Sequence, residues 1–227
     1  MMDPITKAAA PKSKTRLFIV DDHPTLRQGV AYLIRQQPDM ELIGQAEDVP
    51  TARMMLAAVH PDLVVVDLSL KQGSGFDLIR EIRASWPGLP VLVFSMHDEM
   101  LYAQRCMTAG ANGYLMKEEP PEQIVQAIRT IIAGSVYLSE KVKQQALNVA
   151  FLKGGATLSN PIEKLTLREL EIFRLIGQAC STKQIAKRLG VSVKTVELHR
   201  IHIKAKLQAR SFIEVVRLAV QWVERNP

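Results

Sequence analysis

Short apolar runs alternate with amphipathic segments over roughly the first 135 residues of the chain. The apolar runs recur about every 25 residues and occupy residues 16–20, 41–44, 63–67, 91–95 and 113–117. Segments with helical periodicity lie between them, for example at 25–36, 75–86 and 121–134. Strands that alternate with helices are typical of a parallel sheet covered on both faces. The pattern therefore predicts an α/β, flavodoxin-like doubly wound domain with five parallel strands in the order 2-1-3-4-5.

From residue 161 onward the pattern changes to helices alone. Two helix starts have the spacing of a capping box, in Thr166 with Glu169 and in Ser181 with Gln184. Gly190 is predicted to end the second of these helices in a left-handed conformation. Further helical segments at 191–207 and 211–224 bring the number to four. These residues predict a small all-α helix-turn-helix domain.

These patterns divide the chain into four parts. Residues 1–15 are predicted to be a flexible N-terminal tail, and residues 16–134 the α/β domain. Residues 135–160 contain one helical stretch followed by glycine, serine and asparagine, which predicts a partly helical linker. Residues 161–227 form the predicted helical domain.

The two halves of the chain differ in charge. Residues 1–140 hold 13 Lys and Arg against 17 Asp and Glu, whereas residues 141–227 hold 16 against 6. A compact basic domain indicates a polyanionic partner, of which nucleic acid is the first candidate.

Other classes of protein are disfavoured by the composition. No apolar run approaches the roughly 18 residues of a membrane span, and the N-terminus has no secretory signal. Cys106 and Cys180 are far apart and have no metal-ligand spacing, so both are predicted to be reduced, buried thiols of a cytoplasmic protein.

Candidate chemistry gathers at the ends of the predicted strands. Asp67 ends the third strand, and Asp21 and Asp22 end the first, its neighbour across the switch point where ligands of such sheets bind. Three converging carboxylates repel one another unless a cation joins them, and a sparse all-oxygen site favours Mg²⁺. Ser95 ends the fourth strand and Lys117 the fifth. A hydroxyl, an ammonium and a cation around Asp67 are what a carboxylate nucleophile would need to attack a phosphoryl group.

With these residues the sequence resembles the receiver domain of bacterial response regulators. The matching motifs are "VDDHP" (20–24), Asp67, "GSGFDLI" (73–79), Ser95 and "AGANGYLMK" (109–117). The resemblance implies phosphotransfer from a sensor histidine kinase to Asp67. It also implies Mg²⁺ held by Asp21, Asp22, Asp67 and the backbone carbonyl of Ser69, with Ser95 and Tyr114 as the switch pair.

Some positions depart from that pattern or stay open. Lys71 and Glu118 stand where receivers commonly have proline, so the Lys117–Glu118 peptide is either trans or a strained cis bond. We expect His23, His60 and His97 to be surface or loop residues rather than ligands.

The segment 191–207 has the properties of a recognition helix. Val196, Ile203 and Leu207 fall on one face, with His199 at its edge as a partly buried structural residue. The opposite face and its margins carry the predicted DNA contacts, together with one lysine of the preceding helix: Lys183, Lys194, Thr195, Glu197, Leu198, Arg200, Ile201 and Lys204.

Here the sequence looks like the LuxR-type helix-turn-helix of the NarL/FixJ regulators, over residues 165–207. Glu197 followed by Leu-His-Arg resembles the FixJ-like branch, and Ala179 replaces a frequent glycine. The resemblance implies sequence-specific binding to double-stranded DNA as a dimer, with residues 211–223 as the dimer helix.

The combined interpretation is a cytoplasmic two-component response regulator, not an enzyme, that regulates transcription. Phosphorylation of Asp67 would expose the recognition helix or pair two of them, giving a homodimer; RNA polymerase is a further candidate partner. Three alternatives remain open. One is a phosphorylation-independent DNA-binding dimer, and another is an adaptor. The third is an aspartyl-phosphate phosphatase, which usually needs a second acid at the position of Ser69.

Overall fold

The computed structural model describes residues 14–152 and 161–225 of the chain. Most of the predicted tail at 1–15, and residues 153–160 of the predicted linker, lie outside the described residues.

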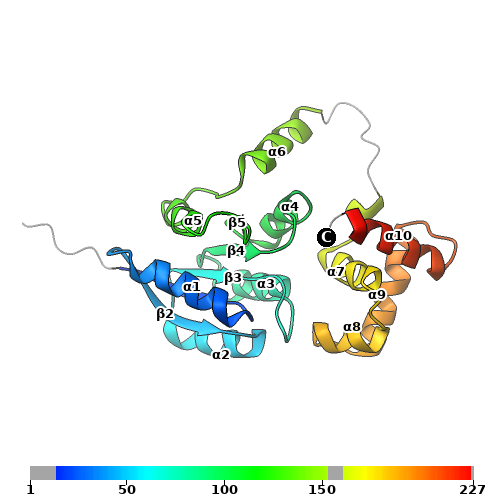
Figure 1. Cartoon of the computed structure of the whole chain (residues 1–227), viewed down its shortest axis with the longest axis horizontal. Coiled ribbons are helices and arrows are strands. Elements are labelled where there is room, and N and C mark those ends of the chain that lie inside the picture. Colours follow the sequence, from blue (N-terminus) through cyan, green and yellow to red (C-terminus); the bar gives the residue numbers. More distant parts are fainter. Residues whose placement is uncertain (1–13, 153–160, 226–227) are drawn as a thin grey trace, which may run out of the picture.

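One sheet of five parallel strands has the order β2-β1-β3-β4-β5, which confirms the predicted fold class (Figure 1). The strands are β1 (Thr15–Val20), β2 (Met40–Ala46), β3 (Leu63–Val66), β4 (Val91–Ser95) and β5 (Gly113–Met116). The helices that follow them are α1 (Pro24–Arg35), α2 (Val49–Val59), α3 (Gly75–Ser85), α4 (Glu99–Ala109) and α5 (Gln123–Ile132).

The sheet separates two apolar cores because alternate residues of each strand point to opposite faces. Leu17 and Ile19 of β1 join the core beneath α1 and α5. Phe18 and Val20 of the same strand join the core beneath α2, α3 and α4. Both sets of side chains are buried, which explains why the strands are continuous apolar runs in the sequence.

The C-terminal part is entirely helical. It contains the 3₁₀ turn η1 (Pro161–Lys164) and the helices α7 (Leu167–Gly177), α8 (Thr182–Leu189), α9 (Val193–Lys206) and α10 (Phe212–Arg225). Both predicted capping boxes are present, and Gly190 ends α8 with φ of 64°, which confirms these local predictions. Helix α10 packs closely on α7, where a Cβ on Gly177 would lie 2.4 Å from the carbonyl oxygen of Ala219.

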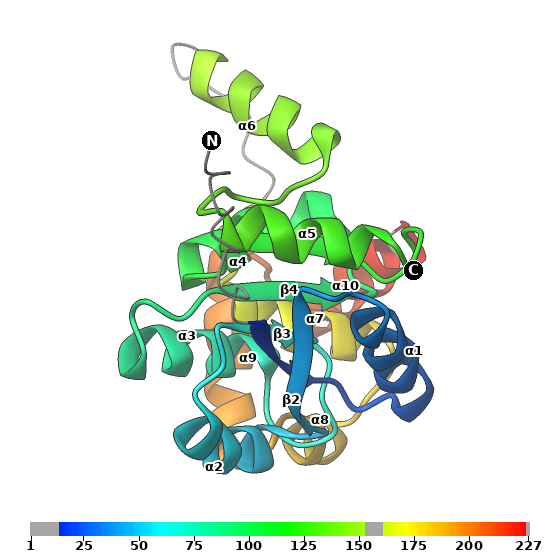
Figure 2. The same cartoon turned by 90° about the vertical axis from the view of Figure 1, so that its left-hand side faces the viewer.

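Helix α6 (Glu140–Leu152) lies in the predicted linker and extends away from the sheet beyond α4 and α5 (Figures 1 and 2). The prediction that both cysteines are buried is half wrong, because Cys106 is fully buried whereas Cys180 is only half-buried. Cys180 follows Ala179, which has a positive φ of 58° just beyond the end of α7. No helix in the described part of the chain is long and apolar enough to cross a membrane.

The two domains are in contact through α7 (Figure 1). Glu171 of α7 accepts a hydrogen bond of 2.9 Å from the Ser74 hydroxyl, and Arg168 lies 3.8 Å from Asp77 of α3. Burial raises the pKa of Glu171, although Arg168 opposes the shift. The core beneath α2, α3 and α4 runs on into the core of the helical domain. We call this contact, made by α7 on α3 and on the loops before α3 and α4, the domain interface.

Candidate functional site

Asp67 lies directly after β3, at the carboxyl end of the sheet, and is 2% exposed. Its Oδ2 accepts a hydrogen bond of 2.7 Å from Lys117 Nζ, and the same ammonium lies 2.7 Å from Asp21 Oδ2. Burial raises the pKa of the Asp67 carboxyl, and this effect outweighs the opposing one of Lys117. The strand ends thus bring a buried carboxylate, its lysine and a second carboxylate together.

Gly75 explains how the chain passes so close to Asp67. A Cβ at position 75 would lie 2.1 Å from the carbonyl oxygen of Asp67 and 2.7 Å from Cα of Leu68. Such distances exclude any side chain without a shift of the backbone. The glycine eight residues after Asp67 therefore allows α3 to start against the loop that carries this carboxylate.

The acidic cluster brings together enough ligand atoms to hold a cation. Asp21, Asp22, His23 and Asp67 offer ligand atoms that all lie within 4.8 Å of one another. Asp22 Oδ1 is buried and, among the described residues, accepts no hydrogen bond, although His23 Nδ1 lies 2.8 Å away. A buried carboxylate oxygen without a hydrogen bond is costly, and a hard cation would satisfy it. The donor set therefore fits the Mg²⁺ that the sequence suggests.

Ser95 ends β4 and Tyr114 is the second residue of the adjacent strand β5, and both are almost fully buried. Tyr114 Oη donates a hydrogen bond of 2.7 Å to the carbonyl oxygen of His97, so its ring is already turned inward. The Ser95 hydroxyl accepts a bond of 3.4 Å from the backbone N–H of His97. Both predicted switch residues are therefore bonded to the loop between β4 and α4.

The structure also shows the Lys117–Glu118 peptide, Lys71 and the histidines, whose conformation or position the sequence left open. No cis peptide occurs within the described residues, so the Lys117–Glu118 bond is trans. Lys71 is exposed and its Nζ lies 4.0 Å from Glu47. His23 is exposed, and His97 lies in the loop between β4 and α4, so both occupy the expected surface or loop positions, although His97 is only 8% exposed.

The predicted DNA-contacting face of α9 is open to solvent. Leu198 is 52% exposed and Ile201 64% exposed in the presence of the N-terminal domain. The other predicted contact residues are either exposed (Lys183, Lys194 and Glu197) or half-exposed (Thr195, Arg200 and Lys204). The opposite face packs on its own domain, with Val196 and Ile203 fully buried. The N-terminal domain does not cover the recognition face, so the expectation that switching exposes this helix does not apply to this conformation.

Arg200 is held inside its own domain more firmly than its predicted role suggests. Its guanidinium donates to the Thr182 hydroxyl and lies 3.6 Å from the centre of the Phe212 ring. The side chain is therefore ordered at the junction of α8, α9 and α10.

A second group of possible metal ligands lies between α7 and α9 and consists of Glu169, His199 and His202. Lys206 already places its ammonium 2.6 Å from Glu169 Oε2. This ion pair, together with the capping box that Glu169 completes, gives the cluster a structural role. His199 is half-buried, as the sequence predicts for a structural histidine.

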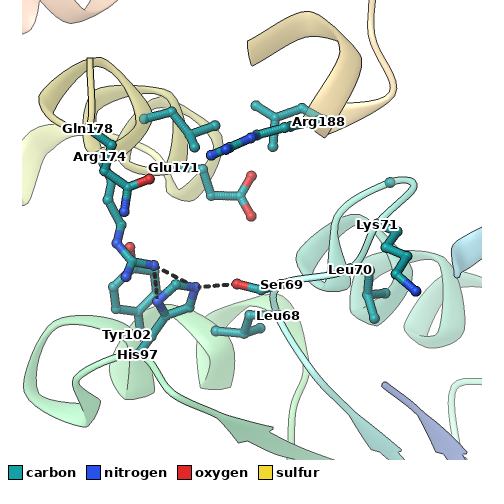
Figure 3. Close-up of a pocket in the computed structure, with 13 residues that line it drawn as sticks. Leu68, Ser69, Leu70, Lys71, His97, Tyr102, Glu171, Arg174, Gln178 and Arg188 are labelled. Carbon is teal, nitrogen blue, oxygen red and sulfur yellow. Dashed lines mark hydrogen bonds between the residues drawn. The ribbon is translucent and has the colours of Figure 1, made fainter. Parts of the chain in front are cut away.

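The residues that join the domains were not predicted from the sequence; the main ones are His97, Glu171 and Arg174. Arg174 Nη1 lies 2.7 Å from His97 Nδ1, beside a cavity of about 240 Å³ between the domains (Figure 3). No local pattern marks these residues, because their neighbours are determined only when α7 docks.

The comparisons with known proteins agree with this geometry. Residues 17–129 match the family described as response regulator receiver domain, and residues 163–219 match the bacterial regulatory proteins of the luxR family.

Similar proteins cover nearly the whole chain. The "Oxygen regulatory protein NreC" of Staphylococcus epidermidis is 35% identical over 212 residues, which cover 91% of this chain and 97% of that protein. The counterpart of the same name in Staphylococcus aureus is 36% identical over 210 residues, with the same coverage of 91% and 97%.

Among solved structures, a LuxR-family two-component response regulator from Aurantimonas sp. SI85-9A1 is 34% identical, with a TM-score of 0.57, over 61% of this chain and 99% of that one. RcsB of Salmonella typhimurium, at 22% identity, shares the fold, with a TM-score of 0.70 over 92% of this chain and 98% of that one. The chain belongs to the NarL/FixJ family of two-component response regulators, non-enzymatic transcription regulators in which a receiver domain is joined to a LuxR-type DNA-binding domain.

Proposed function

We propose that a sensor histidine kinase phosphorylates Asp67, and that this modification controls dimerisation and sequence-specific DNA binding. The observation that carries the proposal is the buried Asp67 carboxylate held 2.7 Å from Lys117 beside Asp21. A carboxylate oxygen of Asp67 attacks the phosphorus of the donor's phosphohistidine. The new O–P bond forms as the P–N bond breaks, and the imidazole nitrogen keeps the bonding electron pair. Lys117 neutralises charge on the phosphoryl oxygens, and the Ser95 hydroxyl donates to one of them.

Magnesium would complete this site. Asp21, Asp22, Asp67 and the backbone carbonyl of Ser69 would hold the ion, which would neutralise phosphoryl charge. The hydrogen-bond-free Oδ1 of Asp22 supports this assignment.

The helical domain supplies DNA recognition through the open face of α9. Glu197 can accept from a cytosine amine, Ile201 can touch a thymine methyl, and lysines contact phosphates or guanine edges. Lys183, Lys194 and Lys204 supply such positive charge, and Thr195, Leu198 and Arg200 lie beside them.

Pairing of two copies fits the exposed side of α10. Val215, Ala219 and Trp222 pack inward, whereas Ile213 is 81% exposed and Val220 36% exposed seven residues later, on the same side of the helix. RcsB of Salmonella enterica has been solved bound to a promoter in the presence of the phosphomimetic BeF₃⁻, and two RcsB dimers have been solved bound to two parallel DNAs. We extend that behaviour to this chain, with residues 16–134 as the receiver unit, 135–160 as the linker and 161–227 as the DNA-binding unit.

The intact mass after incubation with acetyl phosphate and Mg²⁺ tests the phosphoacceptor. We expect one phosphoryl adduct on the wild-type protein and none on Asp67→Asn. An adduct of equal yield on Asp67→Asn would overturn the assignment.

A further inference from the structure

Helices α7 and α9 lie side by side in the DNA-binding domain and bring three metal-binding side chains together (Figure 1). Glu169 comes from the first turn of α7, and His199 and His202 come from α9. Each residue offers one ligand atom, and the three atoms lie within 4.8 Å of one another. Two imidazoles and one carboxylate therefore meet between the helices, and they share no residue with the acidic cluster of the N-terminal domain.

The protein satisfies the polar atoms of this cluster only in part. The buried Glu169 accepts bonds of 2.6 Å from the Thr166 N–H and from Lys206 Nζ, and both end on Oε2. Its other oxygen, Oε1, lies 4.0 Å from His202 Nδ1, which is too far for a hydrogen bond. His199 Nδ1 is buried and has no hydrogen-bond partner in the part of the chain that the structure describes. A buried nitrogen without a partner is costly, and a bound metal ion would remove that cost.

The spacing on α9 allows both histidines to reach one ion. His199 and His202 are three residues apart, so their side chains are neighbours on the surface of the helix. Zinc bonds of about 2.0–2.2 Å place tetrahedral ligands roughly 3.4 Å apart, so the ligand atoms have to move closer together. The His202 side chain is 51% exposed, which leaves its ring free to turn towards Glu169.

We propose that Glu169, His199 and His202 bind a divalent transition metal ion of the Zn²⁺ type, with water as the fourth ligand. Two imidazole nitrogens and one carboxylate oxygen suit zinc, whereas Mg²⁺ prefers oxygen ligands alone. The ion binds Oε1 of Glu169, while Lys206 and the capping bond remain on Oε2. The inference is independent of the proposed role of Asp67.

The ion joins the recognition helix to the helix that precedes the helix-turn-helix. His202 lies four residues after Leu198, so it borders the predicted DNA-contacting face of α9 without belonging to it. The three ligands come together only when α7 packs on α9, so metal binding favours the folded domain. Zinc therefore fixes α9 against α7 and leaves its DNA-contacting side chains open.

Titration calorimetry with Zn²⁺ on the full-length protein tests the site, with excess Mg²⁺ present to compete for the acidic cluster. We expect the wild type to bind one zinc ion at this site and His202→Ala to bind it at least ten-fold more weakly. Two control variants remove other zinc-binding groups, the exposed His60 and the half-buried Cys180. His60→Asn and Cys180→Ser should keep the wild-type affinity.

Lys206→Met tests the arrangement from the opposite direction. Its ammonium is a competing positive charge at Glu169, so its removal should tighten zinc binding about five-fold. Thermal melts provide a second readout and show that each variant is folded. Zinc should raise the melting temperature of the wild type and of Lys206→Met, and should leave that of His202→Ala nearly unchanged.

Three results would overturn the inference: wild-type zinc affinity in His202→Ala, an equal loss of affinity in His60→Asn or Cys180→Ser, or zinc binding by Lys206→Met that is no tighter than in the wild type. None of them bears on the phosphoacceptor, because Asp67 is not part of this cluster.

Discussion

The proposed phosphorylation site and the predicted DNA-contacting face of α9 differ in how far their side chains are buried. Asp67, Asp21 and Lys117 are buried and fixed by one another at 2.7 Å, so each depends on its partners. Leu198 and Ile201 are more than half exposed and contact little of the chain. A buried charge network is costly to break, whereas an exposed face can change with little effect on folding. Substitutions should therefore act on stability in the first region and on binding in the second.

The largest effect on folding should come from Lys117→Met. It leaves two buried carboxylates without their shared cation, so the free energy of unfolding should fall by about 3–5 kcal/mol in Mg²⁺-free buffer. Urea unfolding measures this, with the exposed Lys194→Met as the matched control. Added Mg²⁺ should restore more stability to Lys117→Met than it gives the wild type. Equal stability of Lys117→Met and Lys194→Met would contradict the importance of this network.

Gly75→Ala should have the next largest effect. The added Cβ meets backbone atoms of Asp67 and Leu68, so we expect a loss of about 1–3 kcal/mol. Gly29→Ala is the control, because nothing lies within 4 Å of a Cβ there and the residue is within α1. The control should gain roughly 0.5–1 kcal/mol from helix propensity. A Gly75→Ala protein as stable as Gly29→Ala would show that the close approach is not required.

Glu169→Gln should lower stability by about 1 kcal/mol at neutral pH, since glutamine keeps the capping hydrogen bonds but not the charge paired with Lys206. Burial tends to raise the pKa of Glu169, but the bonds from Lys206 and Thr166 lower it overall. The stabilisation is therefore complete above the unfolded-state pKa of this carboxyl and is lost as the pH falls through the lowered folded value. Urea titrations over a pH series should show the variant and wild type converging in acid. A constant difference at every pH would be inconsistent with this ion pair.

The smallest effect on folding should come from Ile201→Ala, which we expect within about 0.5 kcal/mol of wild type. Its effect on DNA should be larger, at roughly 1–3 kcal/mol of discrimination at one base position. Lys194→Ala should instead weaken binding to all sequences and reduce the salt slope by about one. Anisotropy titrations on duplexes selected with the phosphorylated protein measure both. An Ile201→Ala protein that is less stable but binds DNA as wild type does would show that Ile201 serves folding rather than DNA recognition.

Local signals account for what the sequence predicted. The capping boxes at Thr166 and Ser181 depend on pairs of residues three positions apart. The left-handed end of α8 depends on the backbone of Gly190 alone. Asp21, Asp67 and Lys117 could be brought together because strand order places the ends of β1, β3 and β5 at one edge.

What the sequence did not predict depends on docking. The burial of His97 and its bond to Arg174 arise only when α7 meets the loop before α4, and 77 residues separate them in the chain. Arg200 has the position of a phosphate contact on a helical wheel, but tertiary packing places it between Thr182 and Phe212. A helical wheel or a motif spacing describes one element at a time, so it cannot predict contacts between elements.

Control of DNA binding by phosphorylation of Asp67 can be measured with a DNA titration. A duplex selected with the phosphorylated protein is titrated with wild type and with Asp67→Asn, each with and without acetyl phosphate and Mg²⁺. We expect the donor to tighten DNA binding by the wild type about five-fold or more and to leave the affinity of Asp67→Asn unchanged. Equal affinity of phosphorylated and unphosphorylated wild type, with the adduct verified by mass, would contradict it.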